Sequence, residues 1–363
     1  MRRRQNSIKN KNKQPRNRGV QPQLLVRKTR IVKSKIPNIS VLQNNVKKIV
    51  VGQDTAVDRL ILAIYRSLKI STLKSNILVI GKSGIGKKET IKQIARLLKL
   101  PYVIVDATEY SITNNQEKRP EDMIVDLYSA SGCDLKKAER GILVIDKIDE
   151  KIRDSNVTDV LLNDTFENSV VKIIEGSTIP IMEPDEEQGQ KVVLINTSKI
   201  IVVLMGAFEG LDKVKMVSSG KSVIGFNSHK SSLNGKVQYT KNDLMSYGMS
   251  AELAGQIDTI VKFDQLSEND LADIAKNSKV SIFRKYEQYF AQIGITLEYD
   301  DIIFEKMAKS VSSNRTGAFE LANVTNEAFE DVLLKVFTAK EGQYKKCILN
   351  KDFINNPKDY VLM

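Results

Sequence analysis

The side chains that most metal sites and nucleophilic catalysts need are scarce in this sequence. Among 363 residues there are one histidine, His229, two cysteines, Cys133 and Cys347, and no tryptophan. A single histidine excludes multi-histidine metal sites. Two distant cysteines without a C-x-x-C pair predict neither a disulfide framework nor a zinc site, and they fit a reducing compartment. We therefore expect no resident metal site.

Long apolar runs are also missing. No run approaches the ~20 apolar residues that a bilayer-spanning helix needs, and no apolar segment follows the first arginines as it would in a secretory signal. These absences predict no membrane partner and a cytoplasmic protein, or one of an organelle matrix if the basic N-terminus is a transit peptide. With 41% hydrophobic residues the chain can bury a large core, in a length that suits two domains.

Acidic residues are absent from the first 53 positions, which contain fifteen Lys or Arg residues. The rest of the chain has a net charge of −3, although the whole chain has +12. A basic segment with few apolar side chains cannot offset its ordering entropy, so we predict a disordered tail over residues 1–36. Three roles stay open for it: an arm for nucleic acid or acidic protein, a transit peptide, and a solubilising extension.

Apolar patterning beyond the tail predicts an α/β domain over residues 37–264. A helical stripe begins after Asp54, the expected N-cap, and continues through Val57, Leu60, Ile61, Ile64 and Leu68. Short apolar runs, separated by amphipathic helices, then predict a buried parallel sheet with crossover helices. The runs lie at 76–80, 102–106, 141–146 and 199–205.

The pattern turns helical from Ser267 onward. One short strand is expected in the segment ITLEY, and two more helices extend to about Phe337. We therefore predict a small, mainly helical domain over residues 265–340, followed by a C-terminal extension over 341–363.

A glycine-rich segment joins the first predicted strand to a helix, and it reads GKSGIGKK. In this context G-x-x-x-x-G-K is the pattern of a phosphate-binding loop, with backbone N–H groups directed at phosphate oxygens and Lys87 reaching the terminal phosphates. Asp146 ends the run 141–146, as in a Walker B strand. The predicted nucleotide site comprises Gly81, Lys82, Ser83, Gly84, Ile85, Gly86, Lys87, Lys88 and Asp146.

Two lysines depart from this pattern. Lys88 occupies the position of a Ser or Thr hydroxyl that ligates Mg²⁺, and a cation cannot ligate a metal. Lys147 follows Asp146 and is expected to neutralise that carboxylate. The two lysines bring positive charge to the place of Mg²⁺, so we predict weak or Mg²⁺-independent binding of ATP or ADP.

Several segments in one order resemble ClpX-type AAA+ unfoldases, the ATP-binding subunits of Clp proteases. They are VVGQDTAV, AERGILVID, KIIEGS, NTSKIIVVLMGAFEGLDKV, NDLMSYGMSAELAGQIDTIVKFDQLSENDL and SSNRTGAFEL. The resemblance covers residues 38 to 337 and implies an AAA+ P-loop large domain with a small helical domain. The cysteines of the family's zinc-binding N-terminal domain are not in this sequence.

The resemblance also implies that catalytic groups have been replaced. The family's water-activating Glu falls on Lys147, its arginine finger on Gln256 and its sensor-2 arginine on Phe319. Arginine fingers contribute ~10³–10⁵ in rate. With Lys88, four catalytic positions are substituted, so we name no catalytic residue and expect very slow hydrolysis by a pseudo-ATPase.

Three loops complete the resemblance. The family's aromatic pore loop falls on Glu117-Lys118-Arg119-Pro120, and a basic pore loop falls on the acidic region 183–190, so polypeptide threading is not expected. In contrast, Ile224-Gly225-Phe226 matches the tripeptide by which such rings dock on the Clp peptidase. The alternative for this tripeptide, an ordinary loop packed on its own domain, stays open.

These observations favour a hydrolysis-impaired ring component or regulator of a Clp-type protease and chaperone system. Its expected partners are AAA+ subunits, of its own kind or of an active ClpX-type paralogue, and the Clp peptidase. Two alternatives remain: an active ATP-dependent protein unfoldase, and a nucleic-acid-associated AAA+ scaffold that acts through the basic tail.

Overall fold

The computed structural model describes residues 36–70, 72–110, 118–153, 157–185, 189–218, 238–278, 281–312 and 317–363. Three predicted features lie outside the described residues: the basic tail up to residue 35, Glu117 of the altered pore loop, and Ile224-Gly225-Phe226. The unit described below is Pro37–Met363.

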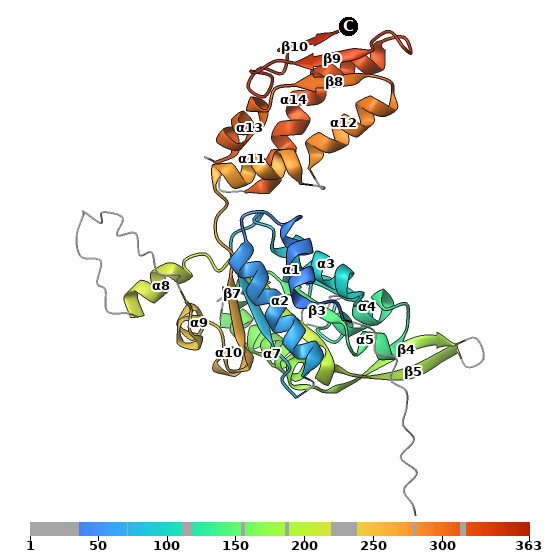
Figure 1. Cartoon of the computed structure of the whole chain (residues 1–363). Coiled ribbons are helices and arrows are strands. Elements are labelled where there is room, and N and C mark those ends of the chain that lie inside the picture. Colours follow the sequence, from blue (N-terminus) through green and yellow to red (C-terminus); the bar gives the residue numbers. More distant parts are fainter. Residues whose placement is uncertain are drawn as a thin grey trace, which may run out of the picture. The chain divides into compact units, whose positions relative to one another are not determined.

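A parallel five-stranded sheet with the order β2-β3-β6-β1-β7 forms the centre of the large domain (Figure 1). Its strands are β1 Ile77–Ile80, β2 Tyr102–Asp106, β3 Ile142–Asp146, β6 Ile201–Gly206 and β7 Thr259–Lys262. The first four coincide with the apolar runs of the sequence, and the predicted α/β fold class is confirmed.

Alternation along these strands creates two cores, one on each face of the sheet. In β1, Ile77 and Val79 pack with α1, α2 and α3, whereas Leu78 and Ile80 pack with α4 and α7 on the opposite face. Strands with both faces covered are apolar throughout, which is why their sequences are unbroken apolar runs. These helices are α1 Ile39–Lys47, α2 Asp54–Lys69, α3 Lys87–Leu98, α4 Asp122–Ala130 and α7 Val157–Glu175.

The start of α2 differs from the prediction, because Gln53 and not Asp54 is the N-cap. The Gln53 side chain donates to the Asp264 carbonyl at 2.7 Å and accepts from the Asp264 N–H at 3.1 Å. Asp54 is the first helical residue, where its charge still interacts favourably with the helix dipole. The Asp54 cap was therefore wrong by one residue.

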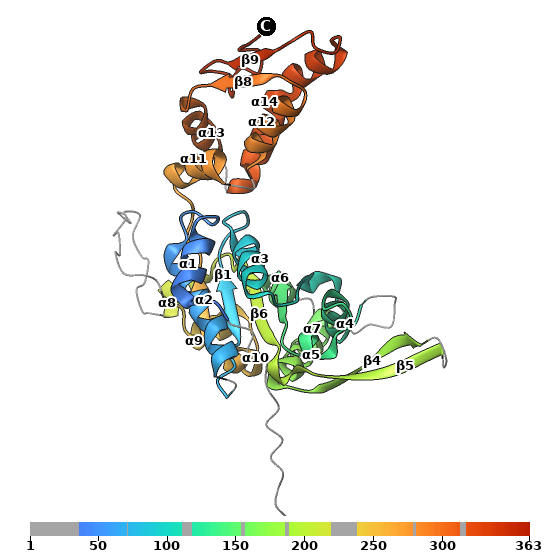
Figure 2. The same ribbon diagram turned by 45° about the vertical axis from the view of Figure 1, so that its right-hand side comes forward.

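Short helices and a hairpin fill the rest of the large domain. Strands β4 Thr178–Asp185 and β5 Gly189–Asn196 form an antiparallel hairpin that extends from the sheet domain (Figures 1 and 2). The acidic region 183–190 falls on this hairpin, of which residues 186–188 are outside the described part. The short helices are η1 Ala107–Glu109, α5 Leu135–Ala138, α6 Ile148–Arg153, η2 Thr197–Lys199, α8 Leu211–Ser218, α9 Lys241–Tyr247 and α10 Ala251–Gln256.

Four helices and a small sheet make up the C-terminal part. The helices are α11 Glu268–Asn277, α12 Ile282–Gln292, α13 Ile302–Ser312 and α14 Ala318–Thr338. The sheet has the order β10-β9-β8, with β8 Thr296–Tyr299, β9 Lys346–Leu349 and β10 Tyr360–Leu362. Residues 341–363, expected as an extension, thus contribute two strands to this sheet. Within the described residues, no helix is long and apolar enough to span a bilayer.

Candidate functional site

The phosphate loop lies between β1 and α3, where the sequence placed it. Gly84 and Gly86 have positive φ values of 74° and 96°, which residues with a Cβ rarely adopt. Gly86 is the N-cap of α3, so the free N–H groups of the first turn and the positive end of the helix dipole lie beside the loop. This geometry is suited to binding phosphate oxygens.

Lys87, at the first position of α3, is only 8% exposed. Its ammonium donates hydrogen bonds to the carbonyl oxygens of Gly81 and Lys82, the latter at 2.7 Å. Burial lowers the pKa of Lys87 to about 8, and the nearby charges of Asp146 and Asp149 offset this only in part. The cation expected to contact phosphate therefore bonds to the loop itself.

Lys88 forms an ion pair with Asp146 at the carboxyl end of β3. The Lys88 Nζ to Asp146 Oδ2 distance is 2.5 Å, and the Asp146 side chain is 10% exposed. A Mg²⁺ site here requires a hydroxyl at position 88 and a carboxylate available to the metal or its water. The residues present do not fit such a site. Lys88 has no hydroxyl to offer the metal, and its ammonium occupies the Asp146 carboxylate.

Lys147 does not neutralise Asp146, contrary to the expectation from sequence. Its Nζ lies 2.7 Å from Asp106 Oδ2 at the end of β2, and its backbone has a φ of 56°. Burial raises the pKa of Asp106, but hydrogen bonds from Lys147 and Thr108 outweigh this and bring that pKa below its ordinary value. The hydrogen bond to Asp106 raises the pKa of Lys147. Each carboxylate therefore has its own lysine.

Asp149 is a framework residue that the sequence analysis missed. It is buried, and it accepts hydrogen bonds from the backbone N–H groups of Ala207 at 3.2 Å and Phe208 at 2.8 Å. These bonds connect α6 to the chain segment after β6. The only signal in the sequence is an aspartate three positions after Asp146, on the first turn of a helix.

The start of α14 closes the site from the C-terminal part of the chain. The Ala318 N–H donates to the Gly84 carbonyl at 3.0 Å, and Gly317, the N-cap, lies against the same loop. Phe319, at the sensor-2 position, is 63% exposed and lines the cavity. No feature of the sequence predicted the backbone contact between Ala318 and Gly84.

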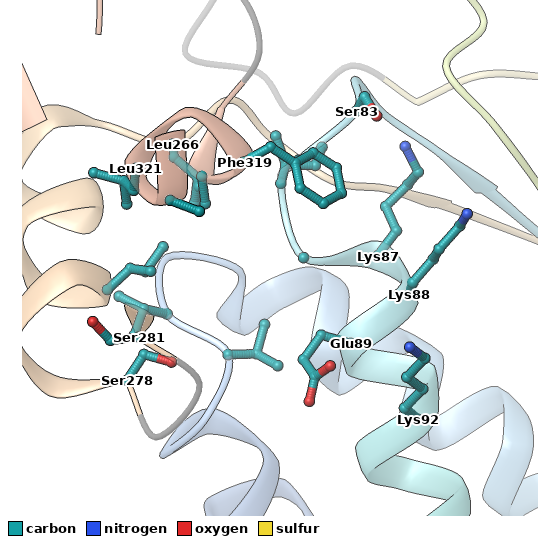
Figure 3. A pocket seen from close by; sticks show the side chains of 18 of the residues that line it. Ser83, Lys87, Lys88, Glu89, Lys92, Leu266, Ser278, Ser281, Phe319 and Leu321 are labelled. Atoms are coloured by element: carbon teal, nitrogen blue, oxygen red, sulfur yellow. The ribbon is translucent and has the colours of Figure 1, made fainter. Parts of the chain in front are cut away.

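These elements enclose a cavity of about 580 Å³, within the usual range for small-ligand sites. Lys87, Lys88 and Lys92 project from α3 along one side of it (Figure 3). Its lining combines a charged part with an apolar part. The charged residues are Lys87, Lys88, Glu89, Lys92, Asp146, Lys147, Asp149, Glu150 and Lys285, and the larger apolar ones are Ile49, Val50, Val51, Ile85, Leu266, Ile274, Ile282, Met307, Phe319 and Leu321.

Most of the predicted nucleotide residues line this cavity, but Gly81 and Lys82 do not, and neither does Gln256. Gly81 and Lys82 lie at the base of the loop, where their carbonyls accept from Lys87. Gln256 lies at the end of α10, outside the cavity lining. Its amide donates to Glu175 Oε1 at 2.7 Å.

The pore-loop positions that the structure describes also lie outside the cavity lining. Of the residues at the aromatic pore-loop position, Lys118 has its Nζ 3.7 Å from Glu109 Oε2. The Arg119 backbone N–H donates to Asp122 Oδ2.

Comparison with known proteins gives a consistent set of relatives. The family profile described as AAA domain (Cdc48 subfamily) matches residues 72–260. The ATP-dependent Clp protease ATP-binding subunit ClpX of Borrelia duttonii is 28% identical over 341 residues, which are 88% of this chain and 79% of that protein. ClpX of Bacteroides thetaiotaomicron is 27% identical over 87% of this chain and 81% of its own. ClpX of Treponema denticola is 28% identical, with 88% and 82% covered.

Proposed function

This chain belongs to the AAA family and is a ClpX-type AAA+ protein, and on that premise we propose that it is a nucleotide-binding ring subunit with impaired ATP hydrolysis. In this proposal it acts within a Clp-type ATP-dependent protease and chaperone system. The family match and the names of the relatives support a place in that system, and the residues of the cavity support the impaired hydrolysis.

One observation carries the proposal, the 2.5 Å ion pair between Lys88 and Asp146. Mg²⁺ neutralises charge that develops on the transferred phosphoryl group, and phosphoryl transfer depends mainly on such electrostatic stabilisation. A lysine fixed on the metal-binding carboxylate supplies one positive charge, but it cannot coordinate two phosphates in fixed geometry. Binding can therefore persist where hydrolysis does not.

Three further substitutions act in the same direction. Lys147 provides no carboxylate to activate water, and Gln256 provides no guanidinium for a neighbouring subunit's phosphate. Phe319 provides no charge at the sensor-2 position. Removing an arginine finger alone costs ~10³–10⁵ in rate, so the combined losses leave no efficient route for hydrolysis.

The backbone of the phosphate loop supports retained binding of ATP or ADP. Its N–H groups and the helix dipole do not depend on side chains, and the apolar part of the cavity offers a place for a base. We propose Gly81 to Lys88 and Asp146 as the nucleotide site. Because the Lys88 ammonium occupies the carboxylate on which a metal would depend, binding is weak or independent of Mg²⁺.

The proposed partners are other AAA+ subunits and the Clp peptidase. The relatives are named as ATP-binding subunits of a Clp protease. We propose accordingly that this chain assembles into rings, with itself or with an active paralogue. Docking through Ile224-Gly225-Phe226 remains a proposal from sequence, as does the division into domains at residues 37–264 and 265–340.

The deciding experiment is a calorimetric titration of the purified chain with ATP and ADP, in EDTA and in Mg²⁺. We expect nucleotide affinities that change less than twofold with Mg²⁺, and no ATP turnover above background. The ClpX of Treponema denticola, prepared identically, is the reference for an active relative. Mg²⁺-dependent turnover at the rate of that reference would identify an active unfoldase instead, and the absence of nucleotide binding would remove the proposed site.

A further inference from the structure

The first turn of α14 is fixed against the phosphate loop by backbone contacts. Gly317 has a φ of 64°, and a Cβ at this residue would lie 3.0 Å from the Gly84 carbonyl oxygen. The next residue, Ala318, donates its N–H to that same oxygen at 3.0 Å. A side chain at 317 would both strain the backbone and push the loop away. The position of the residue that follows is therefore set by the loop.

That residue is Phe319, whose ring projects into the cavity. It is 63% exposed, although Leu321 on the same turn is buried. Figure 3 shows its ring directed from the start of α14 towards the side of the cavity that carries Ser83 and Lys87. A phenyl ring offers no hydrogen-bond donor, and the face of its π-system carries partial negative charge. It is thus a poor neighbour for a phosphate oxygen.

The remaining groups in the cavity favour two phosphates over three. In loops of this type the backbone N–H groups hold the first two phosphates, and the terminal one relies on side chains and metal. Here Lys88 is paired with Asp146 and Lys147 with Asp106. Asp149 and Glu150 add negative charge to the lining. Lys87 already donates to the Gly81 and Lys82 carbonyls. A third phosphate beside the ring therefore meets an apolar face, carboxylates and three lysines that already have partners.

We infer that Phe319 makes this cavity selective for nucleoside diphosphates, so that ADP binds in preference to ATP. The inference rests on the proposed nucleotide site and adds its ligand class. The preference arises because a terminal phosphate beside the ring loses water without gaining a donor, and such a loss is costly for a charged group. Phe319 is a specificity-determining residue and takes no part in holding the first two phosphates.

The test compares the dissociation constants of ATP and ADP by calorimetry in EDTA, for the full chain and three variants. The wild type should bind ADP at least tenfold more tightly than ATP. Phe319→Ala removes the ring and should lower this ratio at least threefold. Phe319→Arg adds a donor for the terminal phosphate and should bring the ratio close to one.

Phe337→Arg is the matched control, because Phe337 lies at the other end of α14, is 64% exposed and does not line the cavity. The ratio of the ATP and ADP dissociation constants should be the same in this variant as in the wild type. Equal binding of ATP and ADP by the wild type would overturn this inference and leave the nucleotide site intact. A ratio unchanged in Phe319→Ala would overturn the role of the ring. Failure to bind either nucleotide would remove the proposed function together with the inference.

Discussion

The phosphate loop and the neighbouring sheet edge face the same cavity, but they are built from different chemical groups. The loop presents backbone N–H groups and the N-terminus of α3, whereas the edge presents the side chains of Asp106 and Asp146 at paired positions of β2 and β3. A substitution other than to proline leaves the backbone N–H in place, but side-chain substitution can change the edge one residue at a time. A protein of this architecture can lose catalysis while it retains binding.

The largest effect is expected from Asp149, which lies on α6, three positions after the edge residue Asp146, and connects this helix to the segment after β6. Asp149→Ala leaves the N–H groups of Ala207 and Phe208 without their acceptor. Hydrogen bonds to charged groups contribute ~1.5–3 kcal/mol each, and orphaned buried donors cost more. We expect unfolding in urea to show a loss of about 3 kcal/mol. Asp149→Asn keeps one acceptor oxygen and should lose less, and equal losses in both variants would contradict this role.

A smaller effect should follow from returning a metal ligand to the edge. Lys88→Thr frees Asp146 and supplies a hydroxyl. Mg²⁺ should then tighten nucleotide binding tenfold or more, against less than twofold in the wild type. Lys92→Thr, one turn further along α3 in the same cavity, is the control and should behave as the wild type. An unchanged response in Lys88→Thr would show that the ion pair is not what excludes the metal.

The loop can be tested by pH, since Lys87 has a pKa of about 8. The protonated ammonium attracts phosphate, and its fraction falls from about nine-tenths at pH 7 to about one-tenth at pH 9. Nucleotide affinity should therefore fall about tenfold as the pH rises over this range. Lys87→Arg, which stays charged, should bind with little pH dependence. A wild-type affinity that does not change with pH would show that the loop binds phosphate through its backbone N–H groups alone.

The smallest effect is expected at the pair of Asp106 and Lys147, whose side chains are 25% and 45% exposed. Asp106→Asn should reduce stability by less than about 1 kcal/mol, as for most exposed ion pairs. Because the pKa of Asp106 is lowered in the folded protein, its contribution exists at neutral pH and disappears as the pH falls through that lowered value. Urea unfolding should show the difference in full at pH 7 and a smaller difference at pH 3.

Sequence predicted the parts of the fold that depend on local pattern. The runs that became β1, β2, β3 and β6 were found within one or two residues, since buried parallel strands are continuously apolar. Strands β9 and β10 were not found, because their short segments gain stability only by pairing, β9 with the distant β8 and β10 with β9. The Asp54 cap failed for a similar reason, the distant pairing of Gln53 with Asp264.

The candidate site was likewise predictable only in part. The position of the loop and the substitution of Lys88 could be read from the motif, but the partner of each lysine could not. Lys147 is adjacent to Asp146 in sequence, yet it bonds to Asp106 on the neighbouring strand. Side-chain direction at the end of a strand depends on the backbone turn that follows, and Lys147 makes that turn with a φ of 56°.

The hydrogen bonds of Lys87 to Gly81 and Lys82 also have a kinetic consequence. An incoming phosphate meets an ammonium with two of its three N–H donors already in use, so full contact with the phosphate requires this side chain to leave at least one of the two carbonyls. Association should be slower than diffusion allows and insensitive to nucleotide base. The same two bonds re-form on release, so the empty loop returns to one defined conformation after each departure.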